Sequence, residues 1–190
     1  MGEEKQIQQL IDGCLRGDRR SQQAVYKLLY GKMKAVCLRY TKDTDQALDV
    51  LQEGFIKVFQ NMDRYTGSGS FEGWVRRIMV NLSIDRFRKQ KNEFLLLNDA
   101  IEADVWVDES EEEENEVDQY DFKPHHIIEA MQQLSPAYRT VFNLYVFENY
   151  THQDIAEALS ISVGTSKSNY AKAKRNMKKI LLKNIGKANE

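Results

Sequence analysis

The amino-acid sequence predicts an all-α protein of two small helical domains joined by an acidic, flexible linker. Three observations support this fold class. Apolar residues recur at intervals of three and four over much of the 190-residue chain, which is the spacing of one face of a helix. There are only two prolines, and a strand-like alternation of apolar and polar residues is absent. Finally, charge divides the chain into two basic segments with a strongly acidic segment between them.

The charge distribution suggests the domain boundaries. Residues 1–92 hold 17 Lys and Arg against 11 Asp and Glu, and residues 125–190 hold 9 against 5. Residues 93–124 hold one Lys against 13 Asp and Glu, so the formal net charge of −2 conceals an acidic middle segment. A segment of this composition cannot bury enough apolar surface to offset chain entropy, and it predicts a self-repelling linker. Each flanking domain has the charge to face a polyanion.

Two helices are predicted early in the first domain. Asp18 is a suitable N-cap for a helix that continues to about Tyr40, and Asp43 is a suitable N-cap for the next. The apolar stripe of the first helix consists of Val25, Leu28, Leu29, Met33, Val36, Cys37 and Tyr40. The stripe of the second consists of Ala47, Leu51, Phe55, Val58 and Met62, and its opposite face carries Asp49, Gln52, Glu53, Ile56 and Gln60.

A loop of glycine, serine and threonine at residues 66–70 separates these helices from a third. One side of the third helix carries Phe71, Trp74, Val75, Ile78 and Leu82. Another side aligns Arg77, Asn81, Ile84 and Arg88. Because Trp74 lies on the apolar side, packing in the core is favoured over a role as a stacking platform for a base.

The sequence of the second domain predicts a helix-turn-helix motif. Ser135 followed by Pro136 is the start of a helix, and residues 151–154 have the form of a capping box that opens a short one. Residues 160–162 form a tight turn, and Ser162 caps the final helix. A short helix, a turn of a few residues and a second helix is the spacing of this motif.

The final helix has two distinct faces. Its apolar back consists of Val163, Tyr170, Ala173, Met177 and Ile180, and its front consists of Thr165, Ser168, Lys172, Arg175 and Lys179. From residue 163 to residue 187 there are eight Lys and Arg and no Asp or Glu. A solvated basic helix would explain the charge alone. Its place after a capped helix and a turn favours a recognition helix, whose small polar groups reach bases while its cations neutralise phosphates.

Several of these segments resemble the extracytoplasmic-function sigma factors of bacterial RNA polymerase. Residues 71–78 with Asn81, Ile84 and Asp85 resemble the promoter-melting helix of region 2 in that family. Residues 52–57 resemble its polymerase-binding helix, and residues 134–136, 139–142, 154–157 and 164–168 resemble its region 4. The chain departs from the family pattern at three positions: Leu48, Ser160 and Lys172. Ser160 stands where the turn usually has a glycine, at a position that often requires a positive φ.

The resemblance implies roles for particular residues. It implies capture of the single-stranded minus-ten element by Arg64, Tyr65, Arg77, Asn81 and Arg88, and contact with the duplex minus-thirty-five element by Ser162, Thr165, Lys167, Ser168, Lys172 and Arg175. It implies docking on the β′ clamp helices of core RNA polymerase by Asp49, Gln52, Glu53 and Ile56, a face that could also be an ordinary solvated one. It further implies an anti-sigma factor as a partner.

Two other classes of protein compete with this interpretation. A stand-alone helix-turn-helix regulator would explain residues 125–190 equally well, and binding to core polymerase separates the two. An enzyme is disfavoured because no phosphate-binding glycine loop, metal-spaced cluster or nucleophile and base pattern is apparent, so neither a cofactor nor a metal is expected. Cys14 and Cys37 are expected to be reduced structural thiols, and the three histidines to be solvated or capping. Without a signal peptide or an apolar run of membrane-spanning length, a cytoplasmic location is expected.

Overall fold

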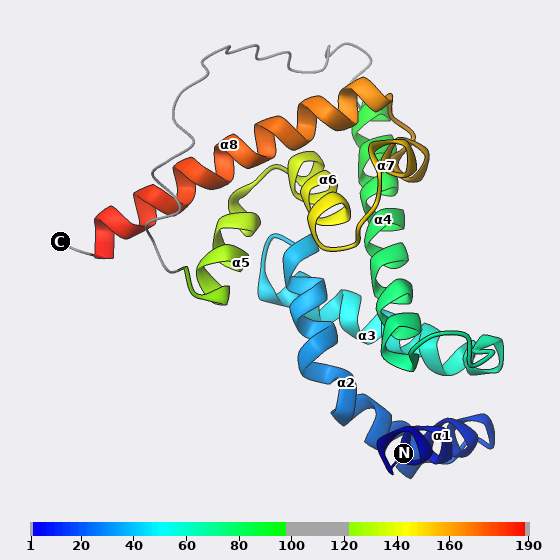
Figure 1. Cartoon of the computed structure of the whole chain (residues 1–190). Coiled ribbons are helices and arrows are strands. Elements are labelled where there is room, and N and C mark those ends of the chain that lie inside the picture. The colour runs from blue at the N-terminus through cyan, green and yellow to red at the C-terminus, as the bar shows by residue number, and fades with distance from the viewer. Residues whose placement is uncertain (1, 98–121, 189–190) are drawn as a thin grey trace. The chain divides into compact units, whose positions relative to one another are not determined.

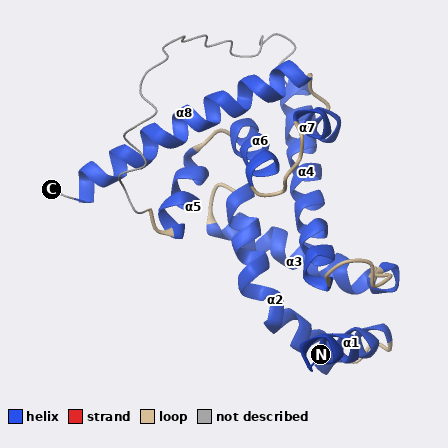
Figure 2. Cartoon of the chain, viewed as in Figure 1, coloured by secondary structure: helices blue, strands red, loops and turns tan. Residues whose placement is uncertain are grey.

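The computed structural model describes residues 2–97 and 122–188, and these residues form helices and loops without any strand (Figure 2). The all-α fold class is therefore confirmed. Figure 1 labels the elements, which are α1 (Gly2–Leu15), α2 (Arg19–Tyr40), α3 (Thr44–Gln60), the 3-10 turn η1 (Met62–Arg64), α4 (Phe71–Leu97), α5 (Pro124–Gln133), α6 (Pro136–Val146), α7 (His152–Leu159) and α8 (Val163–Ala188). The chain forms two compact units, residues 1–84 and 85–190, and the division falls within α4.

The helices of the first unit begin where side chains cap them. The Asp18 carboxylate accepts hydrogen bonds from the backbone N–H groups of Arg20 and Ser21, and the Asp43 carboxylate accepts one from Gln46. Both caps were predicted from the sequence and are confirmed. Each satisfies backbone donors that the first helical turn leaves without intrahelical partners.

The core of the first unit lies where α2, α3 and the start of α4 meet. The predicted stripe of α3 is entirely buried, and so are all but one of the residues predicted for α2. Leu28 is the exception, because its side chain is 52% exposed on the outer side of α2. Ile84, which the sequence aligns with Arg77 and Asn81 on α4, is only 5% exposed and belongs to the core. Other buried residues of α4 are Phe71, Val75, Met79, Val80 and Leu82.

Helices α3 and α4 approach each other closely at one glycine. A Cβ atom added to Gly54 would lie 2.1 Å from the Sδ atom of Met79, which is completely buried. Atoms cannot approach that closely, so a larger residue at position 54 would push the two helices apart or displace the Met79 side chain. Gly54 therefore leaves the space that the Met79 side chain fills between the two helices.

The predicted acidic linker, residues 93–124, lies mostly outside the described residues. Helix α4 continues through Leu97, which is five residues into the range assigned to the linker, and α5 begins at Pro124. Residues 98–121, which hold most of the acidic side chains of the predicted linker, are not among the described residues.

The second unit packs α5 and α8 together and sets α6 and α7 against α8. Ala130, Met131 and Leu134 contact the apolar back of α8, which contributes Ala173, Met177 and Leu181. Completely buried Leu144, Ile155 and Leu159 fill the space between α6, α7 and α8. Burial of one such side chain stabilises a fold by roughly 1.5–3 kcal/mol, so this small core depends on every member.

A buried arginine joins α6 to the end of α5. Arg139 donates hydrogen bonds from Nε to the carbonyl oxygen of Met131 (3.0 Å), and from Nη2 to those of Gln132 (2.9 Å) and Leu134 (2.7 Å). These carbonyls stand at the C-terminus of α5 and its cap residue, where the Leu134 N–H also donates to the Met131 carbonyl oxygen (3.1 Å) and Arg139 supplies further donors. The negative end of the helix dipole also favours a cation at this place. Arg139 thus acts as the C-terminal cap of α5.

Both cysteines, Cys14 and Cys37, are buried free thiols, as expected from the sequence. Burial, followed by the nearby Asp18 carboxylate, raises the pKa of Cys14, which keeps this thiol protonated at neutral pH. Among the described residues, no group of three or more His, Cys, Asp and Glu is arranged to hold a metal ion. Within the same part of the chain, no helix combines the length and the apolar character needed to cross a bilayer.

Candidate nucleic-acid interface

The helix-turn-helix predicted from the sequence is formed by α7, α8 and the turn between them. Thr151 and Asp154 form a complete capping box at the start of α7. Thr151 Oγ1 accepts from the Asp154 N–H (3.1 Å), and Asp154 Oδ2 accepts from the Thr151 N–H (2.9 Å). Hydrogen bonds from the Thr151 side chain, and then from its backbone, lower the pKa of the Asp154 carboxyl below 3.8. The stabilisation is therefore present at neutral pH and is lost as the pH falls through this lowered value.

The turn is closed by a left-handed residue. Ser160 has φ 52° and ψ 54°, which is the conformation that its position opposite the usual glycine of the family predicts. In this conformation the N–H of Ile161 donates a hydrogen bond to the carbonyl oxygen of Ala156 (3.0 Å). Ser162 then caps α8, because its Oγ accepts from the Thr165 N–H (2.9 Å). Holding a serine in this region costs about 1–2 kcal/mol relative to glycine.

His152 is half-buried and packs against two helices, so the expectation of a solvated or capping imidazole does not describe its main contacts. Its Nδ1 lies 3.0 Å from the Oγ of Ser166, a residue with no exposed surface. Its ring stacks on Tyr145 at 4.6 Å and meets Tyr170 edge-on at 5.9 Å. One imidazole at the start of α7 therefore contacts both α6 and α8. Burial, followed by the proximity of Tyr145, raises the pKa of Tyr170, so its hydroxyl stays neutral at physiological pH.

We expect His152→Phe, which keeps the ring contacts but loses the hydrogen bond, to lower the stability of the second unit by about 1–2 kcal/mol. The loss leaves the buried Ser166 hydroxyl without its imidazole partner. In a Ser166→Ala background no hydroxyl remains, so the same substitution should cost distinctly less. Chemical denaturation, together with hydrogen exchange of the second unit, measures the loss of stability from His152→Phe with and without Ser166→Ala. Equal losses in the two cases would show that the hydrogen bond between His152 and Ser166 does not stabilise the unit.

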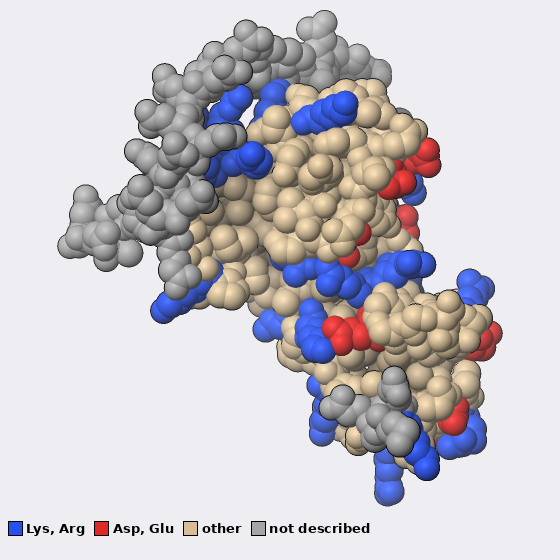
Figure 3. All heavy atoms as spheres, in the orientation of Figure 1, with Lys and Arg blue, Asp and Glu red and all other residues tan. Residues whose placement is uncertain are grey.

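The front of α8 faces solvent, as predicted. Thr165, Lys167 and Ser168 are exposed, whereas Lys172 and Arg175 are half-buried. Ser162 and Thr165 also contact each other through their hydroxyl oxygens (2.8 Å), so these two candidate groups act as a pair at the start of the helix. Lys and Arg side chains gather along α8 in the view of Figure 3. Hydroxyls in the first turns followed by cations farther along match the order in which a recognition helix meets bases and then phosphates.

The candidate minus-ten residues lie in the loop before α4 and along that helix, and all but Arg88 belong to the first unit. Arg64 is exposed at the end of η1. Tyr65 is half-buried, donates a hydrogen bond to the carbonyl oxygen of Gly69 (2.9 Å), and packs on Phe71 and Trp74 at 5.2 and 5.5 Å. The half-buried Trp74 stacks on Phe71 at 5.9 Å. These rings form one aromatic cluster, so the predicted packing role of Trp74 is the one observed.

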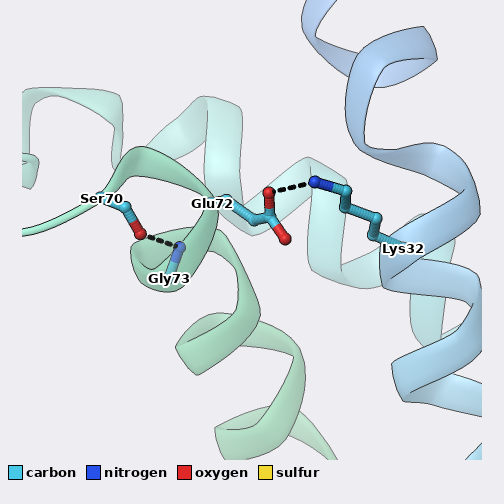
Figure 4. Close-up of polar contacts among 4 residues, drawn as sticks. All are labelled: Lys32, Ser70, Glu72 and Gly73. Carbon is cyan, nitrogen blue, oxygen red and sulfur yellow. Dashed lines mark hydrogen bonds and ion pairs between the residues drawn. The ribbon is translucent and has the colours of Figure 1, made fainter. Parts of the chain in front are cut away.

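Polar contacts fix the beginning of α4 (Figure 4). Ser70 Oγ accepts from the Gly73 N–H (3.0 Å), and Glu72 pairs with Lys32 of α2 at 2.6 Å. The loop from Tyr65 to Ser70 is thus closed by a tyrosine hydrogen bond and ends in a helix cap. The sequence did not predict the cap at Ser70, although a serine three residues before a backbone N–H is the usual signal.

Arg77 and Asn81 are both exposed and lie one turn apart on α4, where they can meet the same strand. Arg88, farther along, is half-buried and pairs with Asp85 at 3.7 Å. The amide of Asn81 can hydrogen-bond a base edge, whereas an arginine supplies a permanent positive charge to a phosphate.

A different surface is formed by α3. Asp49, Gln52 and Ile56 are exposed opposite the buried stripe, and Glu53 is half-buried in an ion pair with Lys57 at 3.5 Å. An ion pair of this kind at the surface contributes little to folding. The four predicted docking residues therefore share one accessible face that combines carboxylates with an apolar side chain.

Comparison with known proteins identifies both units. Residues 25–93 match the model of sigma-70 region 2, and residues 126–177 match that of sigma-70 region 4. The chain is 29% identical to the RNA polymerase sigma-H factor of Pseudomonas aeruginosa, covering 94% of this chain and 95% of that protein. It is 27% identical to the ECF RNA polymerase sigma factor SigW of Bacillus subtilis, covering 94% and 98%. Among solved structures, the Bartonella quintana sigma factor RpoE, in complex with the anti-sigma factor NepR, is similar with a TM-score of 0.48 and 18% identity, covering 84% and 95%.

Proposed function

The chain belongs to the sigma-70 family as an RNA polymerase sigma factor of the extracytoplasmic-function type, and we propose specific roles for its residues in promoter recognition. It is a factor for transcription initiation with a region 2 and a region 4 domain, and its family is not enzymatic. Sigma factors bind core RNA polymerase and promoter DNA. The match to region 2 excludes a stand-alone helix-turn-helix regulator, because such a regulator leaves residues 25–93 unexplained.

We assign region 2 to residues 1–92, the acidic linker to residues 93–124 and region 4 to residues 125–190. The observation that best supports DNA binding by region 4 is the exposed front of α8, where hydroxyls precede cations directly after a capped turn. Reconstitution with core RNA polymerase, followed by mapping of transcription start sites across a genome, tests the assignment. Start sites that share no pair of sequence elements would overturn it.

In region 2, the exposed Asn81 reads a base of the unpaired minus-ten strand, and Arg77 holds the backbone of the same strand. Arg64 and Arg88 add positive charge along the path, and Tyr65 shapes the loop that receives the strand. An amide contact to a base carries sequence information, whereas a contact to phosphate does not.

Asn81→Ala should therefore change discrimination among minus-ten variants at one position, at a cost of about 1–3 kcal/mol for the preferred base. Arg77→Ala should weaken every variant alike. Holoenzyme binding to a set of promoters that differ by single bases measures both. Uniform losses for both substitutions would remove the distinction between base and backbone contacts.

In region 4, Thr165, Lys167 and Ser168 approach the major groove of the minus-thirty-five duplex, with Ser162 holding the helix start. Lys172 and Arg175 neutralise phosphates. Each phosphate contact releases about one counterion, and this release is the source of salt dependence in DNA binding.

Lys172→Ala and Arg175→Ala should each lower the slope of log affinity against log salt by about one. Lys183→Ala should have a smaller effect, because this exposed lysine lies farther from the N-terminus of α8. Titration of promoter DNA with holoenzyme at several salt concentrations gives the three slopes. Slopes identical to that of the parent protein would exclude this face as the DNA contact.

The exposed face of α3, with Asp49, Gln52, Glu53 and Ile56, docks on the clamp helices of the polymerase β′ subunit. Its carboxylates steer it toward a cationic surface, and Ile56 supplies an apolar contact at the centre. We further propose a cytoplasmic location, where the polymerase acts, and regulation by an anti-sigma factor that covers one or more of these surfaces.

A further inference from the structure

The turn between α1 and α2, residues 16–20, carries positive charge that none of the proposed roles uses. Arg16, Arg19 and Arg20 are all exposed on it. Residues 13–42 as a whole hold eight Lys and Arg and one acidic residue, Asp18. The turn also precedes the part of the chain that matches region 2, which begins at residue 25. Exposed cations concentrated on one short segment are typical of a surface that meets a polyanion.

Backbone hydrogen bonds and a helix cap hold this turn in a defined shape. The N–H of Gly17, which has φ 75°, donates to the carbonyl oxygen of Cys14 (2.9 Å), and the N–H of Asp18 donates to that of Gly13 (3.0 Å). The Asp18 carboxylate accepts the Ser21 hydroxyl at 2.6 Å in addition to the backbone bonds of the cap. A Cβ atom on Gly13 would lie 2.0 Å from Ser21 Oγ, so α1 and α2 are in close contact here. The arginines therefore stand on a backbone that is already ordered before a partner binds.

The one acidic residue of the turn cancels only part of its positive charge. Hydrogen bonds from the Ser21 side chain, and then from the backbone N–H groups of Arg20 and Ser21, lower the pKa of Asp18, and the nearby Arg20 charge acts in the same direction. Three arginines against one aspartate leave the turn a formal charge of +2. Because Arg20 is the arginine that acts on Asp18, we assign the remaining charge to Arg16 and Arg19.

Packing connects this turn to the residues proposed to capture the minus-ten strand. Ile11 and Cys14, in the last turns of α1, are buried, and so is Met62 of η1. Helix α1 packs on η1, which ends at the exposed Arg64 and leads directly into the loop that begins at Tyr65. The arginine turn thus follows directly on a helix that packs against the segment leading into this loop. DNA held at the loop carries a phosphate at every nucleotide, so the phosphates beside the minus-ten element are the polyanion nearest to the turn.

We propose that the turn between α1 and α2 binds the phosphate backbone of promoter DNA beside the minus-ten element through Arg16 and Arg19, with Arg20 in support. This inference rests on the proposed capture of the minus-ten strand by region 2. The contact does not depend on base sequence, because a guanidinium group that pairs with a phosphate reads no base edge. It anchors the DNA that Asn81 reads, and it supplies affinity that falls as salt rises.

Arg16→Gln with Arg19→Gln removes two positive charges and leaves the backbone of the turn unchanged. Each phosphate contact releases about one counterion, so this double variant should lower the slope of log affinity against log salt by about two. Holoenzyme is titrated, at several salt concentrations, with a template that contains the minus-ten element and with one that contains only the minus-thirty-five element. The decrease should occur with the first template alone. Arg16→Lys with Arg19→Lys keeps both charges and should keep most of the slope.

Lys5→Gln with Lys42→Gln is the matched control, because it removes two charges from exposed positions outside the turn. Binding to core polymerase without DNA, and thermal unfolding, are measured for every variant. Unchanged values of both assign a loss of DNA affinity to a direct DNA contact.

The outcomes separate this inference from the function on which it rests. If Arg77→Ala weakens binding to the minus-ten template while the double glutamine variant of the turn behaves like the lysine control, the turn does not contact DNA and the minus-ten roles remain. Equal losses with both templates would show that the contact does not lie beside the minus-ten element. A loss of core binding without DNA would show that the turn meets an acidic surface of the polymerase instead. If Arg77→Ala and Asn81→Ala also leave DNA binding unchanged, the proposed minus-ten capture fails, and this inference fails with it.

Discussion

We expect Arg139→Met to unfold region 4 at temperatures at which the parent protein is folded. The substitution removes the donors of three hydrogen bonds to carbonyl oxygens at the end of α5. A buried carbonyl left without a donor costs about 1–3 kcal/mol, and methionine fills much of the volume but donates nothing. The Met131 carbonyl oxygen keeps the Leu134 N–H as a donor, so the carbonyls of Gln132 and Leu134 lose most. Relief from burying a guanidinium offsets part of this cost, so a net loss of about 3 kcal/mol is expected. That is a large share of the stability of a small domain.

Hydrogen exchange measured by mass spectrometry reports on the two units separately. Amides of α5 to α8 should lose protection in Arg139→Met, whereas those of α2 and α3 should keep it. Lys183→Met is the control, because it removes a positive charge from an exposed position of α8. Unchanged protection in α5 and α6 would show that the carbonyls find other donors and that Arg139 is not their cap.

The second large effect concerns the polymerase dock. We expect the double variant Glu53→Arg with Ile56→Ala to weaken core binding by about 100-fold or more, because like charges brought together at an interface cost several kcal/mol. Folding should change little, since the ion pair of Glu53 with Lys57 lies at the surface and Ile56 is half exposed.

A matched control is available on α1. Asp12→Arg with Leu15→Ala repeats the same types of change at the same spacing of three residues, at a half-buried acidic and an exposed apolar position. Equilibrium binding of labelled protein to core polymerase compares the two double variants. If the two double variants bound core polymerase with equal affinity, α3 would not be part of the interface.

Helix boundaries were the part of the fold that the sequence predicted best. Asp18, Asp43, Ser135, Thr151 and Ser162 all cap helices as predicted, because capping depends on a few adjacent residues and can be recognised locally. The left-handed conformation of Ser160 was also predicted locally, because the resembled family usually has a glycine at this position of the turn.

The errors concern which side of a helix meets a neighbour. Periodicity defines an apolar stripe but not its edges, so Leu28 was assigned to the core, and Ile84 was aligned with Arg77 and Asn81 instead of with the apolar stripe. The sequence did not predict the contacts of His152 and Arg139, because those of His152 depend on how α6, α7 and α8 pack and those of Arg139 on how α6 meets the end of α5. The sequence did suggest the candidate DNA-binding and docking residues, but their exposure and mutual contacts required the structure.

The close approach of Gly54 to Met79 joins two surfaces that have different proposed partners. Helix α3 carries the side chains proposed to dock on the polymerase, and α4 carries the exposed Arg77 and Asn81 that we propose to meet the promoter strand. The Met79 side chain of α4 occupies the space that a side chain on Gly54 of α3 would need, so the packing of one helix depends on the other. If α3 docks on the polymerase as proposed, this packing bears on where Asn81 stands relative to the enzyme. A methyl group at position 54 would require Met79 to move, so it would alter the join between the two proposed surfaces while every proposed contact residue stayed chemically the same.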